Sequence, residues 1–225
     1  MTTHIGMLLY PGLTQLDLTG PFEVLHRVPD TRVHLLWKTL DPVTADSGLG
    51  LVPTTTLAGC PPLGMVFVPG GTGQMALMQD GEVLGFLREQ GARARWVTSV
   101  CTGALLLGAA GLLEGYEATT HWAFVDLLPM FGARPARARV VVDRNRVTGG
   151  GVTAGIDFAL RIAAELAGDD VAKRIQLGLE YDPQPPFRSG HPDVAEPAVV
   201  AAMRQHFAAI ASARRDQIAG LARGA

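Results

Sequence analysis

The sequence has few charged residues and only two cysteines, and each shortage argues against a class of protein. Charged residues form 18% of the chain and the formal net charge is −2, so the charge balance predicts neither a nucleic-acid partner nor a membrane surface. Two cysteines, Cys60 and Cys101, cannot form a disulfide framework and favour a reducing compartment, the cytoplasm. CxxC and HxxxH patterns are both missing, so no metal site is expected.

Long apolar runs and a leader are also missing. No uncharged apolar run approaches membrane-spanning length, and the N-terminus lacks the basic region, apolar core and cleavage site of a signal peptide. Apolar residues still form 48% of the 225 residues, which is enough to bury a large core. Because we find neither an internal repeat nor a linker, we expect one domain over residues 1–225.

The sequence does contain an alternation of short apolar strands and helices. Strands are predicted at 4–10, 33–39, 65–68 and 95–100, with a weaker extended segment at 52–57 and a hairpin-like pair at 139–143 and 146–148. Helices are predicted at 82–91, 104–110, 121–131 and 154–167, and another near 21–28 after a loop through Thr14 and Asp17. Uniformly apolar strands between helices predict an α/β fold: a doubly wound, mostly parallel sheet with helices on both faces, as in a flavodoxin-like sandwich.

The C-terminal part differs in composition. Residues 181–187, YDPQPPF, suit neither a helix nor a central strand, and we expect them to cross the surface or a neighbouring subunit. A C-terminal helical extension is predicted from Glu196 to about Arg223. Its apolar stripe must pack on the domain or on a partner and comprises Val199, Val200, Met203, Phe207, Ile210 and Ile218.

Cys101 is the most informative residue of the chain. The apolar strand at 96–100 stops at Cys101, the pair Thr102-Gly103 follows, and an Ala/Leu run then predicts a helix; this order is typical of a nucleophile elbow. Unpaired N–H groups and the dipole at a helix start favour a thiolate, and Gly103 lets the backbone approach closely behind the sulfur. The alternative is a buried structural cysteine, which this context disfavours.

Two strand ends supply candidate partners for the thiol. Ligands of such sheets bind at the carboxyl ends of the strands, so Asp17, Gly70-Gly71 and Cys101 are expected along one rim. The Gly70-Gly71 backbone is a candidate donor to substrate or to a developing negative charge, and a simple strand-ending turn is an equal alternative. The Thr102 N–H is a second donor, and the Thr102 hydroxyl could bind substrate or cap the helix.

A proton shuttle could come from a carboxylate or from a histidine. Asp17 lies between two leucines, so its pKa should be raised, which suits acid–base work; a helix-cap aspartate is the alternative, and Glu23 is the competing carboxylate. His121 could pair with Cys101 as in a protease- or amidase-like dyad, or could merely begin a helix after Thr120. No dinucleotide fingerprint stands at a first βα turn, so no cofactor is expected.

Several segments of the chain resemble one family. Residues 100–103 (VCTG) and 68–71 (VPGG) resemble the ThiJ/PfpI group of the class I glutamine amidotransferase-like superfamily. Residues 10–21 (YPGLTQLDLTGP), 118–122 (ATTHW), 143–151 (DRNRVTGGG) and 181–187 sharpen the resemblance to the isonitrile hydratases within it. The likeness runs over nearly the whole chain. The elbow marks only the superfamily, and the segment around Asp17 discriminates more.

The resemblance implies roles and partners. Cys101 would be the nucleophile, Asp17 the acid/base and Thr102 a substrate-positioning residue, in a homodimer that needs no cofactor. The activity would be hydration of a small uncharged isonitrile to an N-substituted formamide through a cysteine thioimidate. Many relatives have a glutamate where this chain has Asp17. Related regulators share the Thr-Thr-His-Trp segment and continue into a DNA-binding domain that we do not expect here.

Three other functions fit the elbow. A glyoxalase- or amidase-like hydrolase would use Cys101 with His121. A non-enzymatic dimer could sense redox state by oxidation of Cys101. Ligand sensing for transcription would require a DNA-binding partner in trans.

Overall fold

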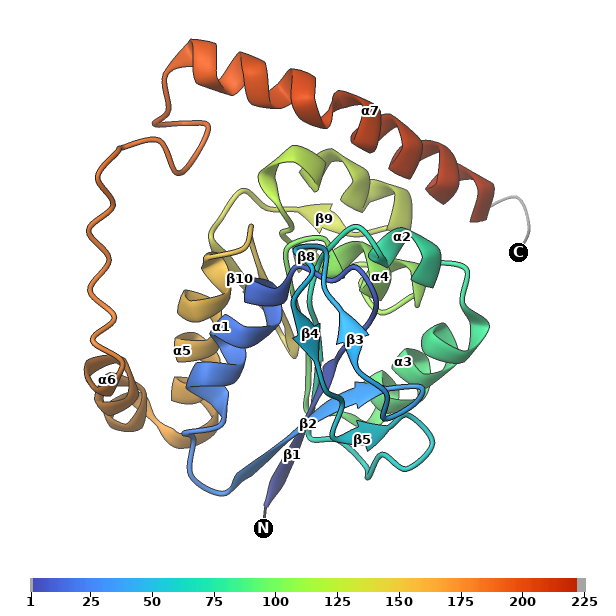
Figure 1. Ribbon diagram of the computed structural model, residues 1–225, viewed down its shortest axis with the longest axis vertical. Helices are drawn as coiled ribbons and strands as arrows, with labels where there is room; N and C mark the ends of the chain where they lie inside the picture. The colour runs from blue at the N-terminus through green and yellow to red at the C-terminus, as the bar shows by residue number, and fades with distance from the viewer. Residues whose placement is uncertain (1, 222–225) are drawn as a thin grey trace.

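A seven-stranded sheet forms the centre of the protein, which we describe from a computed structural model covering residues 2–221 (Figure 1). Its strands lie in the order β10-β11-β7-β6-β1-β2-β5. All neighbours are parallel except the pair β10 and β11. The bounds are β1 (Thr3–Leu8), β2 (Thr31–Trp37), β5 (Thr55–Thr56), β6 (Met65–Val68), β7 (Trp96–Val100), β10 (Val140–Asp143) and β11 (Arg146–Gly149). This sheet confirms the predicted doubly wound fold.

Four further strands form two small pairs outside the central sheet. An antiparallel pair follows β2 and consists of β3 (Val43–Thr44) and β4 (Gly50–Leu51). A parallel pair consists of β8 (Glu117–Ala118) and β9 (Arg134–Pro135), and β8 contacts β10 and β11 of the central sheet. Both pairs lie in connections, and each contributes one residue to the core, Val43 and Ala118.

Helices cover the sheet in two groups (Figure 1). On one side α1 (Gln15–Leu25) packs against α5 (Ala154–Ala167), and α5 packs against α6 (Asp169–Gly178). The other group consists of α2 (Gln74–Leu77), α3 (Gly81–Arg93) and α4 (Gly103–Ala109), in which α4 contacts both α2 and α3. A 3-10 helix, η1 (Trp122–Phe131), packs on α4, and the long α7 (Pro197–Leu221) lies over η1.

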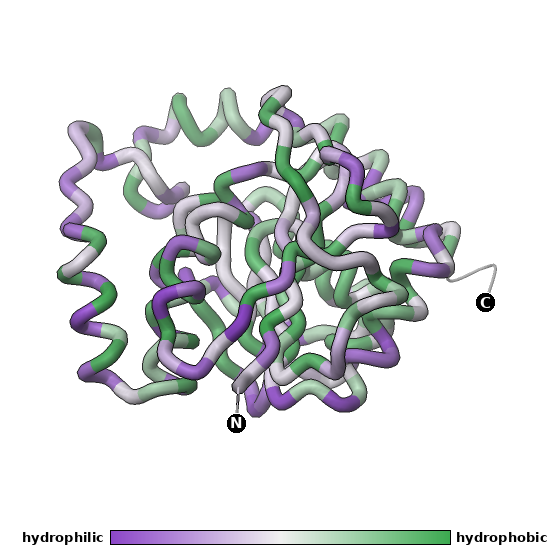
Figure 2. The backbone as a smooth tube through the Cα atoms, turned by 60° about the horizontal axis from the view of Figure 1, so that its bottom comes forward, coloured by the Kyte–Doolittle hydropathy of each residue, from purple (hydrophilic) through white to green (hydrophobic). Residues whose placement is uncertain are grey.

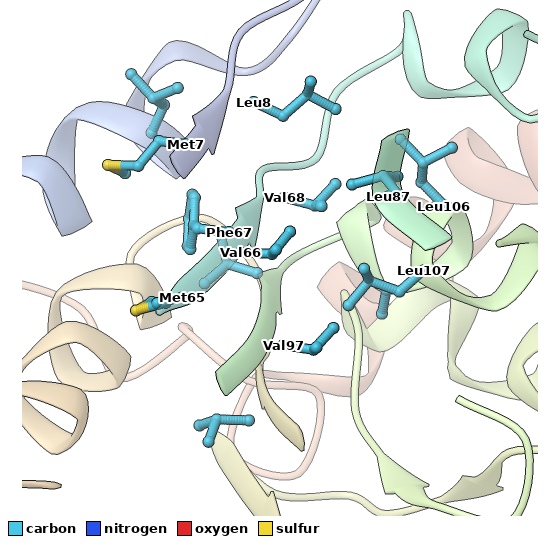
Figure 3. Close-up of a cluster of buried hydrophobic side chains, with 14 of the residues drawn as sticks. Met7, Leu8, Met65, Val66, Phe67, Val68, Leu87, Val97, Leu106 and Leu107 are labelled. Carbon is cyan, nitrogen blue, oxygen red and sulfur yellow. The ribbon is translucent and has the colours of Figure 1, made fainter. Parts of the chain in front are cut away.

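The core explains why the central strands carry apolar residues on both faces. Every residue of β6 is buried, and its side chains alternate between the two helical layers (Figure 3). Phe67 faces the α5 layer, where its ring lies 5.6 Å from that of Phe158, while Val66 and Val68 face Leu106 on the opposite side. Along the outer helices, by contrast, hydrophobic and hydrophilic segments alternate (Figure 2).

The strand order creates a natural binding crevice between β1 and β6. From β1 the chain proceeds outward through β2 to the edge strand β5, and it then returns to β6 on the other side of β1. Adjacent strands whose connections leave in opposite directions form a topological switch point, where ligands of such folds bind. Residues that follow β1, β6 and β7 therefore meet at one rim.

The first helix begins earlier than predicted. Asp17 lies in the first turn of α1, not in a loop before a helix near Pro21–Val28. The prediction was wrong because Pro21 was taken as an early helical position, whereas it lies inside the helix. Packing against α5 offsets the lost backbone hydrogen bond: Gly155 brings the two helices so close that a Cβ there would lie 2.9 Å from the Pro21 ring.

Other local predictions were confirmed or corrected in detail. The hairpin β10–β11 and the helices α3, α4 and α5 were predicted, whereas α2 and α6 were missed and the extended segment at 52–57 contributes only the two residues of β5. The predicted helix at 121–131 is 3-10 rather than α, and it contains Pro129. A proline cannot donate the backbone hydrogen bond that an α-helix needs.

The C-terminal segment follows the prediction in outline. Residues 181–187 have no regular structure and are largely exposed. Helix α7 ends at Leu221 within the described range, and the predicted continuation to Arg223 falls on residues outside it. Its apolar stripe packs in part: Phe207 and Ile210 pack against the core and Ile218 is buried, whereas Val199 and Met203 are exposed. Among residues 2–221 no helix combines the length and hydropathy needed to cross a bilayer.

Candidate active site

Two backbone-to-side-chain hydrogen bonds join the three strand ends at the rim. The Gly70 N–H, after β6, donates to Oδ2 of Asp17 at 2.9 Å, and the Gly71 N–H donates to Oγ1 of Thr102 at 3.1 Å. Asp17 comes from α1, and Thr102 follows β7 directly after Cys101. The rim predicted from the parallel sheet is therefore present, and its side chains are fixed by the strand-ending turn after β6.

Gly70 is required by close packing. A Cβ at this position would lie 2.7 Å from Oδ2 of Asp17, 2.6 Å from the Thr102 nitrogen and 2.7 Å from Oγ1 of Thr102. Both N–H groups are bonded to side chains of the site, and their donation to substrate stays a prediction. The turn positions the carboxylate and the hydroxyl.

Cys101 occupies a strained backbone conformation at the elbow. Its φ is +52°, a left-handed value that is uncommon for residues other than glycine. The Cys101 N–H donates to the Gly150 oxygen at 2.8 Å, and the Cys101 carbonyl accepts from Oγ1 of Thr120 at 2.6 Å. Gly103 has backbone carbonyls of the β6 end so close that a Cβ would overlap them. A strained residue between a strand and a helix agrees with the predicted nucleophile elbow.

Asp17 has the raised pKa expected of it. The residue is fully buried, and burial raises the pKa of its carboxyl to about 7, while hydrogen bonding from the Cys101 thiol and the Gly70 N–H acts in the opposite direction. Its second oxygen, Oδ1, has no hydrogen-bond partner among residues 2–221. A carboxyl that titrates near neutrality can both give and take a proton under physiological conditions.

Cys101 does not have the lowered pKa expected at a helix start. Burial, and secondly the negative charge of Asp17, raise the pKa of the thiol far above its usual range, and the N–H groups of Thr102 and Val152 only partly oppose them. The prediction was wrong because α4 is short and the sulfur is shielded from water, so desolvation exceeds the effect of the helix dipole. The thiol therefore needs help from its neighbours to ionise.

His121 does not form the predicted alternative dyad. Its Nδ1 accepts a hydrogen bond from the Ala123 N–H at 3.3 Å, and its ring packs against Phe124 and Phe207, with centroids 5.5 and 5.2 Å away. Burial lowers the pKa of His121 to about 4, so the imidazole is neutral at pH 7. Within the described residues it makes no hydrogen bond to Cys101; the neighbouring Thr120 does instead.

A cavity of about 910 Å³ opens beside the elbow, on the side of α7. Its lining includes Thr120, His121, Gly150 and Gly151 from the elbow supports, and Phe207 from α7. Because Thr120 and Gly150 both hydrogen-bond the Cys101 backbone, the floor of this cavity is the outer side of the elbow. Cys101, Asp17 and Thr102 are not among its lining residues.

One charged residue near the site was missed in the sequence. Arg214 of α7 is buried, and its guanidinium carbon lies 4.1 Å from the centre of the Phe124 ring. The signal was present, since Arg214 lies at helical spacing from Phe207 and Ile218 on the packed face of α7. Within residues 2–221 no group of three His, Cys, Asp or Glu side chains is arranged to hold a metal ion.

Known proteins share this arrangement. Residues 3–165 match the DJ-1/PfpI family. The chain is 59% identical over 208 residues to an isonitrile hydratase of Pseudomonas putida, covering 92% of this chain and 91% of that protein. A crystal structure of a ThiJ/PfpI family protein from Pseudomonas syringae superposes with a TM-score of 0.95 at 47% identity, over 97% of this chain and 91% of the other.

A regulator is more distantly similar. The HTH-type transcriptional regulator GbdR of Pseudomonas aeruginosa is 31% identical over 186 residues, which cover 79% of this chain and 50% of the regulator. The shared part thus accounts for only half of that protein. The sheet order, the elbow at Cys101 and the span of these matches agree, and the chain belongs to the DJ-1/PfpI family.

Proposed function

We propose that the protein hydrates an isonitrile to the N-substituted formamide. The observation that carries this proposal is the buried pair of Cys101 and Asp17, in which each group acts on the pKa of the other. The P. putida isonitrile hydratase, 59% identical over nearly the whole chain, supplies the reaction class. A thiol and a carboxyl that titrates near pH 7 suit a substrate that must gain both a nucleophile and a proton at one carbon.

The first step adds the thiol across the terminal carbon of R–N≡C. Cys101 gives its proton to the Asp17 carboxylate, its sulfur bonds to the carbon, and Asp17 passes the proton to the same carbon. The product is a thioimidate, R–N=CH–S–Cys, and Asp17 is again a carboxylate. The low solvent exposure around Cys101 keeps competing water away from the thiolate during this step.

Water then completes the reaction. The oxygen of the water molecule adds to the thioimidate carbon while Asp17 takes a proton from that water. Asp17 then passes the proton to the thioimidate nitrogen. The resulting intermediate, R–NH–CH(OH)–S–Cys, expels the sulfur and becomes the formamide R–NH–CHO. The hydroxyl proton returns to the thiol through Asp17, so the balance is one isonitrile plus one water for each formamide. The Thr102 N–H, beside the sulfur, is the proposed donor to negative charge at the reacting centre.

The experiment that tests this function follows both product and adduct. Purified protein is mixed with an alkyl isonitrile in H₂¹⁸O, the formamide is measured by mass spectrometry, and intact protein is examined for a Cys101 adduct. We expect labelled formamide from the wild type and none above background from Cys101→Ala, with methylglyoxal as a comparison substrate. Full turnover by Cys101→Ala would exclude the covalent route, and turnover of methylglyoxal alone would favour the glyoxalase alternative.

We also propose that the protein is a homodimer. Support comes from apolar side chains left uncovered along the C-terminal segment: Leu177, Phe187, Val194, Val199 and Met203. Such a surface is a liability unless another chain covers it. Light scattering after size exclusion should give twice the chain mass, and Phe187→Asp should weaken the association; a wild-type monomer at micromolar concentration would refute the proposal.

The proposed setting is a reducing compartment such as the cytoplasm. Both cysteines are free thiols, and a nucleophilic thiol persists where disulfides are not formed. Labelling of both thiols in freshly lysed cells would support this setting.

A further inference from the structure

Arg214 is a buried cation without a counter-charge in contact. The residue is 3% exposed, its Nε has no hydrogen-bond partner, and it takes part in none of the ion pairs formed within residues 2–221. Burying an ionised group without compensation is costly, and an apolar side chain of similar size is often as stable or more so. Packing therefore gives no reason for an arginine at this position.

The surroundings of Arg214 lead directly to the elbow. Its guanidinium lies over the Phe124 ring, and the Phe124 N–H donates to the His121 carbonyl at 2.8 Å. The preceding residue, Thr120, donates to the Cys101 carbonyl. Charges on Cys101 are among those that act on the guanidinium, so the cation lies within electrostatic reach of the sulfur.

The titratable groups around the cation narrow the choice of counter-charge. Tyr10, at the end of β1, is neutral near pH 7 because burial raises the pKa of its hydroxyl. His121, before η1, is neutral because burial and Arg214 lower the pKa of its imidazole. Asp46, after β3, is exposed and accepts a hydrogen bond from Thr14. None of these three places a buried negative charge against Arg214.

The Cys101–Asp17 pair remains as the buried source of negative charge. Above about pH 7 the pair holds one proton, either as thiol and carboxylate or, after the proton moves from sulfur to the carboxylate oxygen, as thiolate and carboxylic acid. Both forms carry one negative charge. The charge of Cys101 acts on Arg214, so the cation favours the form whose negative charge lies on the sulfur.

We propose that Arg214 is a positioning residue that supplies the counter-charge of the Cys101–Asp17 pair, and thereby makes the reactive thiolate form accessible. The arginine acts through this pair and needs no contact with substrate. The inference deepens the proposed function, on which its catalytic meaning rests, but the chemistry that tests it is reaction of the thiol alone.

The test measures the reactivity of Cys101 with neutral iodoacetamide from pH 6 to 10, by intact mass, in full-length protein carrying Cys60→Ser. Three variants are compared with this parent. Arg214→Met removes the charge and keeps the length, Arg214→Lys keeps the charge, and Arg215→Met removes a charge from the neighbouring, exposed position of α7. Thermal unfolding of each variant is recorded alongside.

The expected result separates charge from shape. Loss of one nearby cation shifts a pKa by about 1 unit or more. Arg214→Met should therefore lower the population of the thiolate form, and slow its alkylation at pH 8, about tenfold. Arg214→Lys should react within about threefold of the parent, and Arg215→Met should match it. Arg214→Met should unfold at the same temperature as the parent or higher.

Several results would overturn the proposal. Superimposable profiles of the parent and Arg214→Met would show that the cation does not act on the pair, and an Arg214→Lys variant as slow as Arg214→Met would show that shape matters instead. Failure of Arg214→Met to fold would overturn it too, because the proposal requires an apolar side chain to be tolerated there. If Arg214→Met slowed the alkylation of Cys101 by anionic iodoacetate but not by neutral iodoacetamide, Arg214 would be an anion-binding group. Alkylation needs no isonitrile, so failure of the proposed hydration is recognised separately.

Discussion

The rim of the sheet and the helix above it are built in opposite ways. At the rim, backbone N–H groups of one glycine turn bind Asp17 and Thr102, and Gly70 leaves no room for displacement. In α7, Arg214 has no ion-pair partner within the described chain, and the first half of the helix exposes apolar side chains. The side chains of the rim are held in place by backbone hydrogen bonds, whereas α7 lines the cavity and carries a buried charge without an ion pair among residues 2–221.

Removing the Asp17 carboxylate should have the largest effect of these changes. It should separate the role of Asp17 in turnover from its effect on the pKa of the Cys101 thiol. We expect Asp17→Asn to lower the turnover number at least about 10³-fold, because Asp17 is the group of the rim that titrates near pH 7. Alkylation of Cys101 at pH 8 should nevertheless become faster, because the charge of Asp17 raises the pKa of the thiol. Formamide production and intact-mass alkylation rates measure the two effects. Active Asp17→Asn protein would remove the carboxylate from the mechanism.

Adding one methyl group at the turn should test how tightly the rim is built. Gly70→Ala places a Cβ against Asp17 and the Thr102 nitrogen at less than contact distance, so we expect a loss of about 1–3 kcal/mol in the free energy of unfolding and a severe loss of turnover. Gly81→Ala, where a Cβ meets open space, is the matched control. Urea denaturation measures the change; equal stability of the two variants would mean that the rim is pliable.

The pH dependence of stability should reveal the buried carboxyl. The pKa of Asp17 is about 7 in the folded protein against an ordinary value of 3.8, so the folded state binds more protons between these values and its stability falls as pH rises from about 4 to 7. The full contribution is up to about 4 kcal/mol, from about 1.4 kcal/mol per unit. Urea midpoints of wild type and Asp17→Asn across this range should converge toward low pH, and parallel curves would contradict the burial of the charge.

The Thr102 hydroxyl should matter less than the carboxyl. Thr102→Val keeps the shape but leaves the Gly71 N–H without its acceptor, which should cost about 1–3 kcal/mol of stability and lower turnover about tenfold. Thr102→Ser restores the oxygen and should recover most of both. Should Thr102→Ser behave like Thr102→Val, the methyl group rather than the hydrogen bond would be the important contact.

The smallest effect on turnover is expected from changing His121, whose imidazole packs against Phe207 of α7. His121→Gln keeps a polar side chain before η1, and we expect turnover within about threefold of wild type because Nδ1 of His121 caps the 3-10 helix instead of facing the thiol. Loss of activity in His121→Gln with retained activity in Asp17→Asn would reverse the assignment and restore the Cys–His hydrolase. Initial rates on one isonitrile are sufficient to decide.

The sequence predicts the rim better than it predicts α7. Strands with apolar residues on both faces can only be covered on both sides, and the parallel sheet that follows from this rule brings Asp17, Gly70 and Cys101 to one edge. The start of α1 and the raised pKa of Cys101 could not be predicted in this way, because packing by Gly155 and the desolvation of one sulfur arise only from tertiary contacts. Arg214 was missed for another reason. Its spacing from Phe207 and Ile218 places it on the packed face of α7, but a charged residue in an Ala-rich helix is ordinarily solvated.

The left-handed backbone of Cys101 sets stability against function at a single residue. A φ of +52° is comfortable for glycine and costs an ordinary side chain about 1 kcal/mol, so a glycine at the elbow would relieve the chain of strain while removing the sulfur from the rim. A search for heat-resistant variants that ignores activity would therefore consider this position, together with Asp30, Arg144 and Glu180, whose φ is also positive. The backbone strain and the proposed nucleophilic role of Cys101 therefore make opposite demands on the same residue.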